Sequence, residues 1–125
     1  MSRHGTFHWN ELMTTDPEAA AGFCAALTGC GIATMPMPEG VYRVMMQGDR
    51  PVGGIMGMVP GLPPGTPPHW FSYLAVDDVD AACARVRELK GEVRREPWDI
   101  SGVGRIAIII DSTGAALGLI TPAAS

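Results

Sequence analysis

Two stretches of this sequence begin in the same way: residues 8–20, HWNELMTTDPEAA, and residues 69–82, HWFSYLAVDDVDAA. In each stretch, a strand-like run is followed by aspartate and then by an alanine-rich run. Asp16 followed by Pro17 is typical of a helix start, because aspartate caps free N–H groups and proline fits the first helical position. The stretch therefore predicts a strand followed by a helix, and its echo predicts the same pair again.

A single shift of 62 residues aligns the two halves beyond the echo. Chance matches would need different gaps, so one offset that serves a strand, a helix and a later hairpin predicts duplicated β-α-β-β-β units. The shift pairs Leu12 with Leu74, Asp16 with Asp78, Ala19 with Ala81, Ala20 with Ala82, Leu27 with Leu89, Gly29 with Gly91, Arg43 with Arg105 and Asp49 with Asp111.

The duplication predicts one domain over residues 1–125, with unit one at 6–58 and unit two at 69–122. Residues 59–68, VPGLPPGTPP, contain five prolines and two glycines and are predicted to connect the units. Hydrophobic patterning predicts strands at 6–14, 31–37, 41–48, 52–58, 70–76, 92–95, 105–111 and 116–121, and helices from Asp16 to just before Gly29 and from Asp78 to Lys90, the latter ended by Gly91.

Composition narrows the class of molecule. The chain has 125 residues, of which 46% are apolar and 18% charged, enough for a buried core. A net charge of −4 without a basic stripe argues against nucleic acid as a partner. The sequence shows no apolar run of membrane-spanning or signal-peptide length, so we expect a cytoplasmic protein that does not enter membranes. Three cysteines without metal-site spacing, Cys24, Cys30 and Cys83, are expected to be buried free thiols.

The offset also shows that the two His-Trp pairs are not equivalent. His8 and His69 are 61 residues apart, so His8 matches Trp70 rather than His69. Alternate strand residues face opposite sides of a sheet. One face of the first strand therefore carries Trp9, Glu11 and Met13, and the matching face of the second unit carries Phe71, Tyr73 and Ala75.

Three segments, NELMTTDPEAAAGF (10–23), YLAVDDVDAACARVRELKGEV (73–93) and GRIAIIIDSTGAALGLI (104–120), resemble the glyoxalase, bleomycin-resistance and ring-cleaving dioxygenase superfamily, also called vicinal oxygen chelate proteins. Residues 111–114, Asp-Ser-Thr-Gly, replace the family's usual Asp-Pro-x-Gly turn. The resemblance covers residues 7–122. It implies an α+β fold with two tandem βαβββ units, curved half-open mixed sheets around a cavity, one helix outside each, and a homodimer.

Metal enzymes of this superfamily hold a divalent ion with His, Glu or Gln at four strand positions. By resemblance these positions fall on Trp9, Met56, Phe71 and Gly118. Indole and phenyl rings lack a suitable lone pair, glycine has no side chain, and a thioether suits soft copper(I) rather than Zn²⁺, Fe²⁺ or Mg²⁺. The sequence therefore predicts no metal site and no cofactor.

An aromatic and sulfur-rich lining takes the place of the ligands. Such side chains suit a planar or hydrophobic small molecule, although each could equally be ordinary core. Trp98, Asp99 and Ile100 are predicted to form a glycine-containing loop that caps the pocket or anchors itself in the core. The predicted ligand-binding residues are Trp9, Met13, Met45, Met56, Phe71 and Trp98.

Glu11, Tyr73 and His69 are the candidate catalytic residues. A carboxylate that faces inward is partly desolvated and could exchange a proton near neutral pH, with a phenol as oxyanion partner and His69 at the cavity mouth. The structural alternatives are a structural hydrogen bond or an ion pair for Glu11, with Arg43 or Arg105 as candidate partners, and a rim hydrogen bond for His69. The sequence does not decide whether the two arginines face the cavity.

Three functions compete on these grounds. The first is a metal-independent protein that binds an aromatic or amphipathic small molecule, similar to bleomycin-resistance members. The second is a metal-independent isomerase, lyase or cyclase that uses Glu11 with Tyr73 or His69. The third is a metal-dependent glyoxalase or dioxygenase, which needs ligands that the four positions do not supply. The sequence favours the first.

Overall fold

The residues that the structure describes form two helices and eight strands, which confirms the predicted α+β class. The computed structural model describes residues 3–37, 40–58 and 64–123. These residues form two compact units: the first unit is residues 9–71, and the second unit is residues 1–8 with 72–125. The elements are β1 (Phe7–Thr14), α1 (Pro17–Thr28), β2 (Gly31–Met37), β3 (Gly40–Gln47), β4 (Arg50–Gly57), β5 (His69–Ala75), α2 (Val79–Glu88), β6 (Glu92–Ile100), β7 (Gly104–Ile110) and β8 (Ala116–Pro122).

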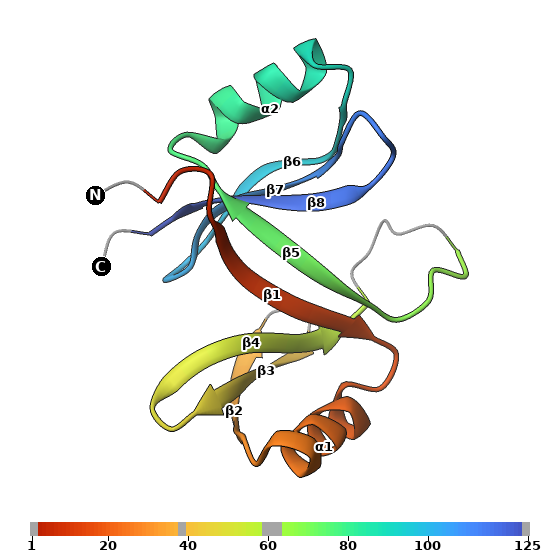
Figure 1. Ribbon diagram of the computed structural model, residues 1–125, viewed down its shortest axis with the longest axis vertical. Helices are drawn as coiled ribbons and strands as arrows, with labels where there is room; N and C mark the ends of the chain where they lie inside the picture. The colour runs from red at the N-terminus through yellow and green to blue at the C-terminus, as the bar shows by residue number, and fades with distance from the viewer. Residues whose placement is uncertain (1–2, 38–39, 59–63, 124–125) are drawn as a thin grey trace. The chain divides into compact units, whose positions relative to one another are not determined.

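The first unit carries the strands β2, β3, β4 and β1 in that order, with β1 parallel to β4 and the other pairs antiparallel. Helix α1 lies on one face of these strands (Figure 1). The core under the helix comprises Ala21, Cys24 and Ile55, with the partly buried Leu12, Ala20, Ile32 and Met45 packed against it.

The second unit repeats this arrangement with β5, β8, β7 and β6, and β5 is parallel to β8. Helix α2 covers one face of its strands in the same way (Figure 1). Its core comprises Val79, Cys83, Ala107, Ile109 and Leu119.

The helix starts follow the predicted capping. The Asp16 carboxylate accepts a hydrogen bond from the backbone N–H of Ala19 (3.1 Å), and Pro17 is the first helical residue. Asp78 caps α2 through the N–H groups of Asp80 (3.0 Å) and Ala81 (3.2 Å). The two aspartates that the offset pairs therefore perform the same structural task.

The end of α2 corrects one prediction. The sequence predicts a helix as far as Lys90, but α2 ends at Glu88, and Lys90 itself is left-handed, with φ of 68°. A Cβ on Gly91 would lie 2.7 Å from both the Ile110 carbonyl oxygen and the Val86 side chain. Gly91 is therefore required for close approach of the chain to β7, whereas in α1 the predicted Gly29 is left-handed, with φ of 75°.

The predicted loop at Trp98, Asp99 and Ile100 is wrong, because these residues belong to β6. The strand runs from Glu92 to Ile100 and pairs with β7 through two irregularities in register, between Val93 and Arg95 and between Arg95 and Trp98. These bulges disturb the alternation of side chains, which is the signal that predicts a strand from sequence.

The strand registers also correct the 62-residue match beyond the helices. Leu12 lies opposite Ile55 and Leu74 opposite Leu119, so the offset grows from 62 on the first strand to 64 on the last. Arg43 pairs with Ile55, and Ala107 pairs with Leu119. The structural equivalent of Arg43 is therefore Ala107, and its match with Arg105 is wrong.

The remaining predictions on chain organisation are tested in part. Cys24, Cys30 and Cys83 are free and buried, as predicted. Of the predicted connector, residues 59–63 lie outside the described residues. In the described part of the chain, neither helix has the length and apolar character needed to cross a membrane.

Candidate functional site

The two faces of the first-unit sheet have different environments. Leu12 and its partner Ile55 lie on the face that packs against α1. Alternation places Trp9, Glu11 and Met13 on the opposite face. Glu11 is 4% exposed and Met13 1% exposed, while Trp9 is half-buried. A carboxylate is thus buried on the face that α1 does not cover.

Tyr42 on β3 reaches this carboxylate. The phenol oxygen of Tyr42 donates a hydrogen bond to Glu11 Oε1 (2.7 Å), and Trp9 Nε1 donates one to the same phenol oxygen (2.8 Å). The three side chains form a linear chain in which indole donates to phenol and phenol donates to carboxylate.

Gly54 makes room for this arrangement. It is the β4 partner of both Glu11 and Val44, so it lies between β1 and β3 on the same face as Glu11. A Cβ on Gly54 would overlap the hydroxyl oxygen of Tyr42. The absence of a side chain at residue 54 therefore allows Tyr42 to lie across β4 and reach β1.

The environment fixes the proton on Tyr42. Burial, and next the negative charge of Glu11, raise the pKa of the Tyr42 phenol far above its ordinary range. The hydrogen bond from Trp9 opposes this shift only in part. Tyr42 therefore remains protonated and donates to Glu11 at neutral pH.

The second unit has different residues at the equivalent positions. Tyr73 pairs with Gly118 as Glu11 pairs with Gly54, so Tyr73 is the structural equivalent of Glu11, and Phe71, two residues earlier, that of Trp9. The register equivalent of Tyr42 is Ile106, because the offset on this strand is 64. An isoleucine cannot donate a hydrogen bond, so the duplicated units have diverged at this position.

Met45 lies on the other side of the sheet. It pairs with Gly53 and packs in the cluster under α1, so it does not share a face with Trp9. Met56 pairs with Met13 on the face of Glu11 and is half-buried. We therefore retain Met56 and Met13 beside the polar chain and leave Met45 out of the candidate site.

His69 and Phe71 lie next to each other at β5. Their rings are edge to face, with centroids 6.3 Å apart, and His69 Nδ1 lies 2.9 Å from the carbonyl oxygen of Pro67. A bond to a carbonyl requires the proton on Nδ1, which leaves Nε2 as the acceptor in the neutral ring. The rim hydrogen bond expected for His69 is thus present, and its catalytic role stays a prediction, as does that of Tyr73 in the second unit.

The Trp98 ring is covered by a cation. The Arg95 guanidinium carbon lies 3.6 Å above the ring centroid. This cation–π contact occupies one face of the indole and gives Trp98 a structural role on β6. Its predicted contact with a ligand stays untested.

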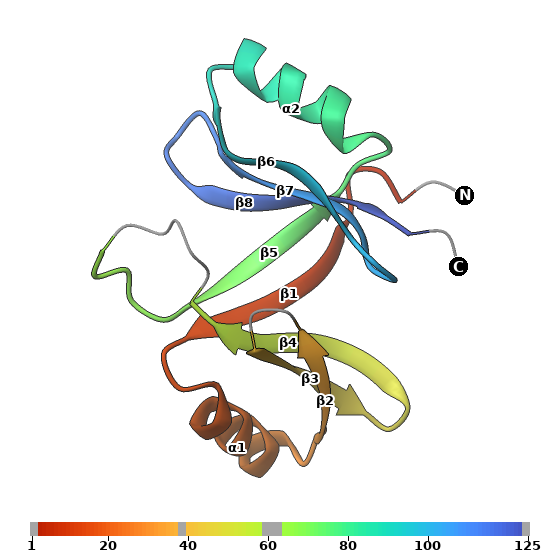
Figure 2. The same ribbon diagram turned by 180° about the vertical axis from the view of Figure 1, so that it is seen from behind.

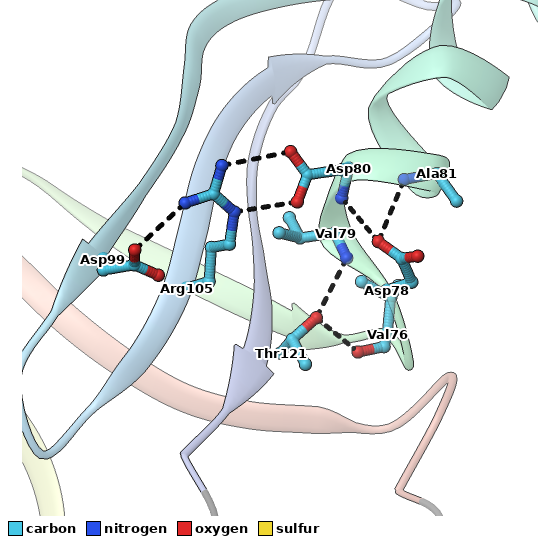
Figure 3. Close-up of polar contacts among 8 residues, drawn as sticks. All are labelled: Val76, Asp78, Val79, Asp80, Ala81, Asp99, Arg105 and Thr121. Atoms are coloured by element: carbon cyan, nitrogen blue, oxygen red, sulfur yellow. Dashed lines mark hydrogen bonds and ion pairs between the residues drawn. The ribbon is translucent and has the colours of Figure 1, made fainter.

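The two arginines do not pair with Glu11. Arg105 donates to Asp80 through Nε (2.7 Å) and Nη2 (3.1 Å) and to Asp99 through Nη1 (3.2 Å), as Figure 3 shows. Its guanidinium lowers the pKa of the Asp80 carboxyl, so the pair is ionised. Arg43 pairs with Ile55, so it lies on the sheet face that packs against α1. Glu11 lies on the other face of the sheet.

Figure 3 also shows how the start of α2 is attached to β8. The hydroxyl of Thr121 accepts from the backbone N–H of Val79 (2.9 Å) and donates to the Val76 carbonyl oxygen (2.9 Å). These bonds fix the first turn of α2 against β8. The whole cluster is a structural connection among α2, β6, β7 and β8.

The residues present do not fit a metal centre of the superfamily kind. The register shifts the last-strand position of the first unit from Met56 to Gly54, the equivalent of Gly118, and neither glycine can ligate. Within residues 3–37, 40–58 and 64–123, no three His, Cys, Asp or Glu side chains group as metal ligands.

Sequence reasoning missed Tyr42 and Gly54. Tyr42 is next to Arg43 in the sequence, and nothing in its neighbours indicates that it reaches across a strand. The Gly53-Gly54 pair is the one signal in the sequence, because glycine inside a strand often marks close approach of another group.

Comparisons with known proteins agree with this fold. Residues 6–119 match the family model described as Glyoxalase/Bleomycin resistance protein/Dioxygenase superfamily. The chain is 43% identical over 121 residues to "Putative glyoxylase CFP32" of Mycobacterium tuberculosis, covering 95% of this chain and 45% of that protein. It is 32% identical over 116 residues to the anthracycline biosynthesis protein DnrV of Streptomyces peucetius, covering 92% of this chain and 38% of that protein.

The chain thus spans less than half the length of these curated relatives. Among solved structures, methylmalonyl-CoA epimerase from Mycobacterium tuberculosis has a TM-score of 0.69 at 16% identity, over 99% of this chain and 92% of that chain. That likeness concerns the fold. The family match over most of the chain and the βαβββ order of both units lead to one conclusion: the chain belongs to the Glyoxalase/Bleomycin resistance protein/Dioxygenase superfamily.

Proposed function

We propose that this chain binds an aromatic or amphipathic small molecule, without a metal ion, on the first-unit face that carries Trp9, Tyr42 and Glu11. The observation that carries the proposal is the hydrogen-bonded chain from indole to phenol to buried carboxylate. A buried carboxylate is costly unless it is hydrogen-bonded, so this arrangement stabilises an acceptor where strands usually carry apolar residues.

The side chains of this face define the ligand's chemistry. Trp9 offers a half-buried indole, and Met56 a half-buried thioether, both suited to a flat apolar ring. Glu11 accepts hydrogen bonds, so a hydroxyl or amino group on that ring would be recognised. A planar ring system with a polar donor fits these features best.

The name of one relative supports an aromatic ligand. DnrV is called an anthracycline biosynthesis protein, and anthracyclines are planar ring systems with hydroxyl and amino groups. An anthracycline is therefore a suitable first probe for this chain, with a saturated steroid of similar size as the comparison compound.

The test is isothermal titration calorimetry of the anthracycline against matched variants. Trp9→Leu is expected to weaken binding by about 1–3 kcal/mol, because the variant loses the stacking contact between the indole and the ligand and the apolar area that this contact buries. Glu11→Gln and Tyr42→Phe should each weaken it at least about tenfold. Trp70→Leu is the control, because Trp70 is 56% exposed and lies on β5. Equal losses for Trp9→Leu and Trp70→Leu, or none in any variant, would place the ligand elsewhere.

Acid–base catalysis is the second candidate function, and the burial of Glu11 favours it. A carboxylate that is 4% exposed and bonded to a protonated phenol could remove a proton from carbon next to a carbonyl group. Tyr73 or His69 would then assist, as the sequence predicts. The check is exchange of the α-proton of a ketone ligand in D₂O; exchange that persists in Glu11→Gln would remove Glu11 from such a reaction.

Three buried free thiols are consistent with a reducing compartment, so we also propose a cytoplasmic location. Fractionation of cells that produce the protein would test it, and recovery in the culture medium would contradict it.

A further inference from the structure

Strand β6 carries three carboxylates and two arginines. Each carboxylate forms an ion pair, and none of these pairs uses Arg95. The pairs are Glu92 with Arg94 (3.4 Å from Oε1 to Nε), Glu96 with Arg87 of α2, and Asp99 with Arg105 of β7 (3.2 Å from Oδ2 to Nη1). Among the described residues, Arg95 is therefore the arginine of β6 that has no carboxylate partner.

The contact that holds Arg95 is with an aromatic ring. Its guanidinium carbon lies 3.6 Å from the centroid of the Trp98 ring, and both side chains are half-buried. At this distance the flat guanidinium lies over the ring face, where the ring quadrupole attracts a cation. The N–H groups at the edge of the guanidinium remain able to donate to a planar pair of acceptor oxygens. In the described part of the chain, these groups make no hydrogen bond.

Arg95 and Trp98 lie on the sheet face of the second unit that does not pack against α2. Arg95 pairs with Ile108 and Trp98 pairs with Ile106, and directly paired residues project from the same face. Ala107, between the two isoleucines, packs in the core under α2, so the isoleucines face the other way. Figure 2 shows α2 along one side of β6, β7 and β8. Because Ile106 and Ile108 are buried, the guanidinium lies beside apolar side chains that screen charge poorly.

The first unit shows that the fold does not require a cation at this position. The offset of 64 that relates β3 to β7 makes Val44 the equivalent of Ile108. Val44 pairs with Ala33 as Ile108 pairs with Arg95, so the equivalent of Arg95 is a small apolar residue. A half-buried charge costs free energy unless a group of opposite charge compensates it. The presence of arginine on β6 therefore indicates a role in binding rather than in folding.

We propose that Arg95, held over Trp98, binds the carboxylate of a small molecule on this face of the second unit. Two N–H groups in the guanidinium plane match the two oxygens of a carboxylate, which gives a bidentate, charge-assisted contact. The stacking on Trp98 restricts the side chain before the ligand arrives, so less conformational entropy is lost on binding. This site is separate from the one proposed on the first unit, and neither proposal rests on the other.

Charge favours a carboxylate over a phosphate as the bound group. The chain carries a net charge of −4, and β6 itself has three acidic residues against two arginines. An anion with two negative charges is repelled by these groups more strongly than an anion with one. We therefore expect a singly charged carboxylate to bind more tightly than a phosphate monoester that carries the same organic group.

The first test is a titration of the wild-type protein with benzoate, followed by the arginine Nε–H signals in ¹H–¹⁵N NMR spectra. The Arg95 signal is identified by its absence from the spectrum of Arg95→Gln. Benzoate is expected to shift this signal to saturation, whereas the signal of Arg105, which is engaged by two aspartates, should stay in place. Benzamide has the same ring without the charge and should cause no shift, and phenyl phosphate should bind more weakly than benzoate.

Variants then test the contribution of the guanidinium. Arg95→Gln is expected to raise the dissociation constant for benzoate at least about tenfold, and Arg95→Lys should also weaken binding, because an ammonium cannot form the planar bidentate contact. Arg94→Gln is the matched control on the same strand, since Arg94 already pairs with Glu92. An Arg95 signal that does not move, or moves equally with benzamide, would overturn the proposal. Equal losses for Arg95→Gln and Arg94→Gln would overturn it too, and tighter binding of phenyl phosphate would contradict the choice of a carboxylate.

Discussion

At the scale of single residues, the candidate site depends on three side chains and one missing side chain. Glu11 is buried, Tyr42 donates to it, Trp9 donates to Tyr42, and Gly54 leaves the space that Tyr42 crosses. The face that carries Trp9 and Glu11 follows from alternation along the first strand. The hydrogen-bond donor to Glu11 cannot be predicted from alternation, because it depends on the register between β1, β4 and β3.

Because of the Tyr42 phenol, the free energy of unfolding is expected to fall at alkaline pH. The pKa of this phenol is raised in the folded protein relative to the ordinary value near 10, so the folded state binds the proton more tightly than the unfolded state. The stability from this group is complete below pH 10 and is lost as the pH rises above it. Urea unfolding between pH 8 and pH 11 should show a steeper loss in the wild type than in Tyr42→Phe. Parallel curves would contradict the pKa assignment.

The variant Gly54→Ala tests whether Tyr42 needs the space that glycine leaves at residue 54. The added Cβ would displace the Tyr42 hydroxyl, so we expect a loss of about 1–3 kcal/mol in the free energy of unfolding and weaker ligand binding. Gly57→Ala is the matched control on the same strand, because a Cβ there meets nothing within 4 Å. Denaturant titration measures both, and equal effects of the two variants would contradict the role of Gly54.

At the scale of elements, the sequence predicts helix starts and strand positions well and predicts registers poorly. Asp16 and Asp78 are local signals, since each caps the residues that follow it. The end of α2 and the length of β6 depend on contacts far along the chain. Gly91 must approach Ile110, and bulges break the alternation of β6. A fixed offset of 62 also fails once a loop differs in length, which is why Arg43 does not correspond to Arg105.

Lys90→Gly tests the account of the end of α2. Lys90 is the one non-glycine residue with positive φ in the described residues, and a left-handed conformation is costly for a side chain with Cβ. Replacement by glycine is expected to raise the free energy of unfolding by up to about 1 kcal/mol, after the greater flexibility of the unfolded chain is taken into account. Thermal unfolding measures the change. A loss of stability would mean that other contacts of Lys90 outweigh the backbone strain.

At the scale of the whole molecule, duplication has produced two units with the same fold and different surfaces. The first unit contains the indole–phenol–carboxylate chain, and its elements α1 and β2 together carry one charged side chain, that of Glu18. In the second unit, Tyr73 and Ile106 occupy the positions equivalent to Glu11 and Tyr42, and ion pairs join side chains on its surface. The repeat and the family could be recognised from sequence, but the difference in polar chemistry required the strand registers. We therefore propose that binding of the planar ligand is a property of the first unit.

The most direct test of the central claim is anthracycline binding by the purified, untagged protein before and after treatment with EDTA, with metal content measured on the same samples. We expect no stoichiometric metal, the same dissociation constant with and without the chelator, and no saturable rise in melting temperature with Ni²⁺, Zn²⁺, Fe²⁺ or Mn²⁺. One bound metal ion per chain, together with loss of ligand binding in EDTA, would contradict it.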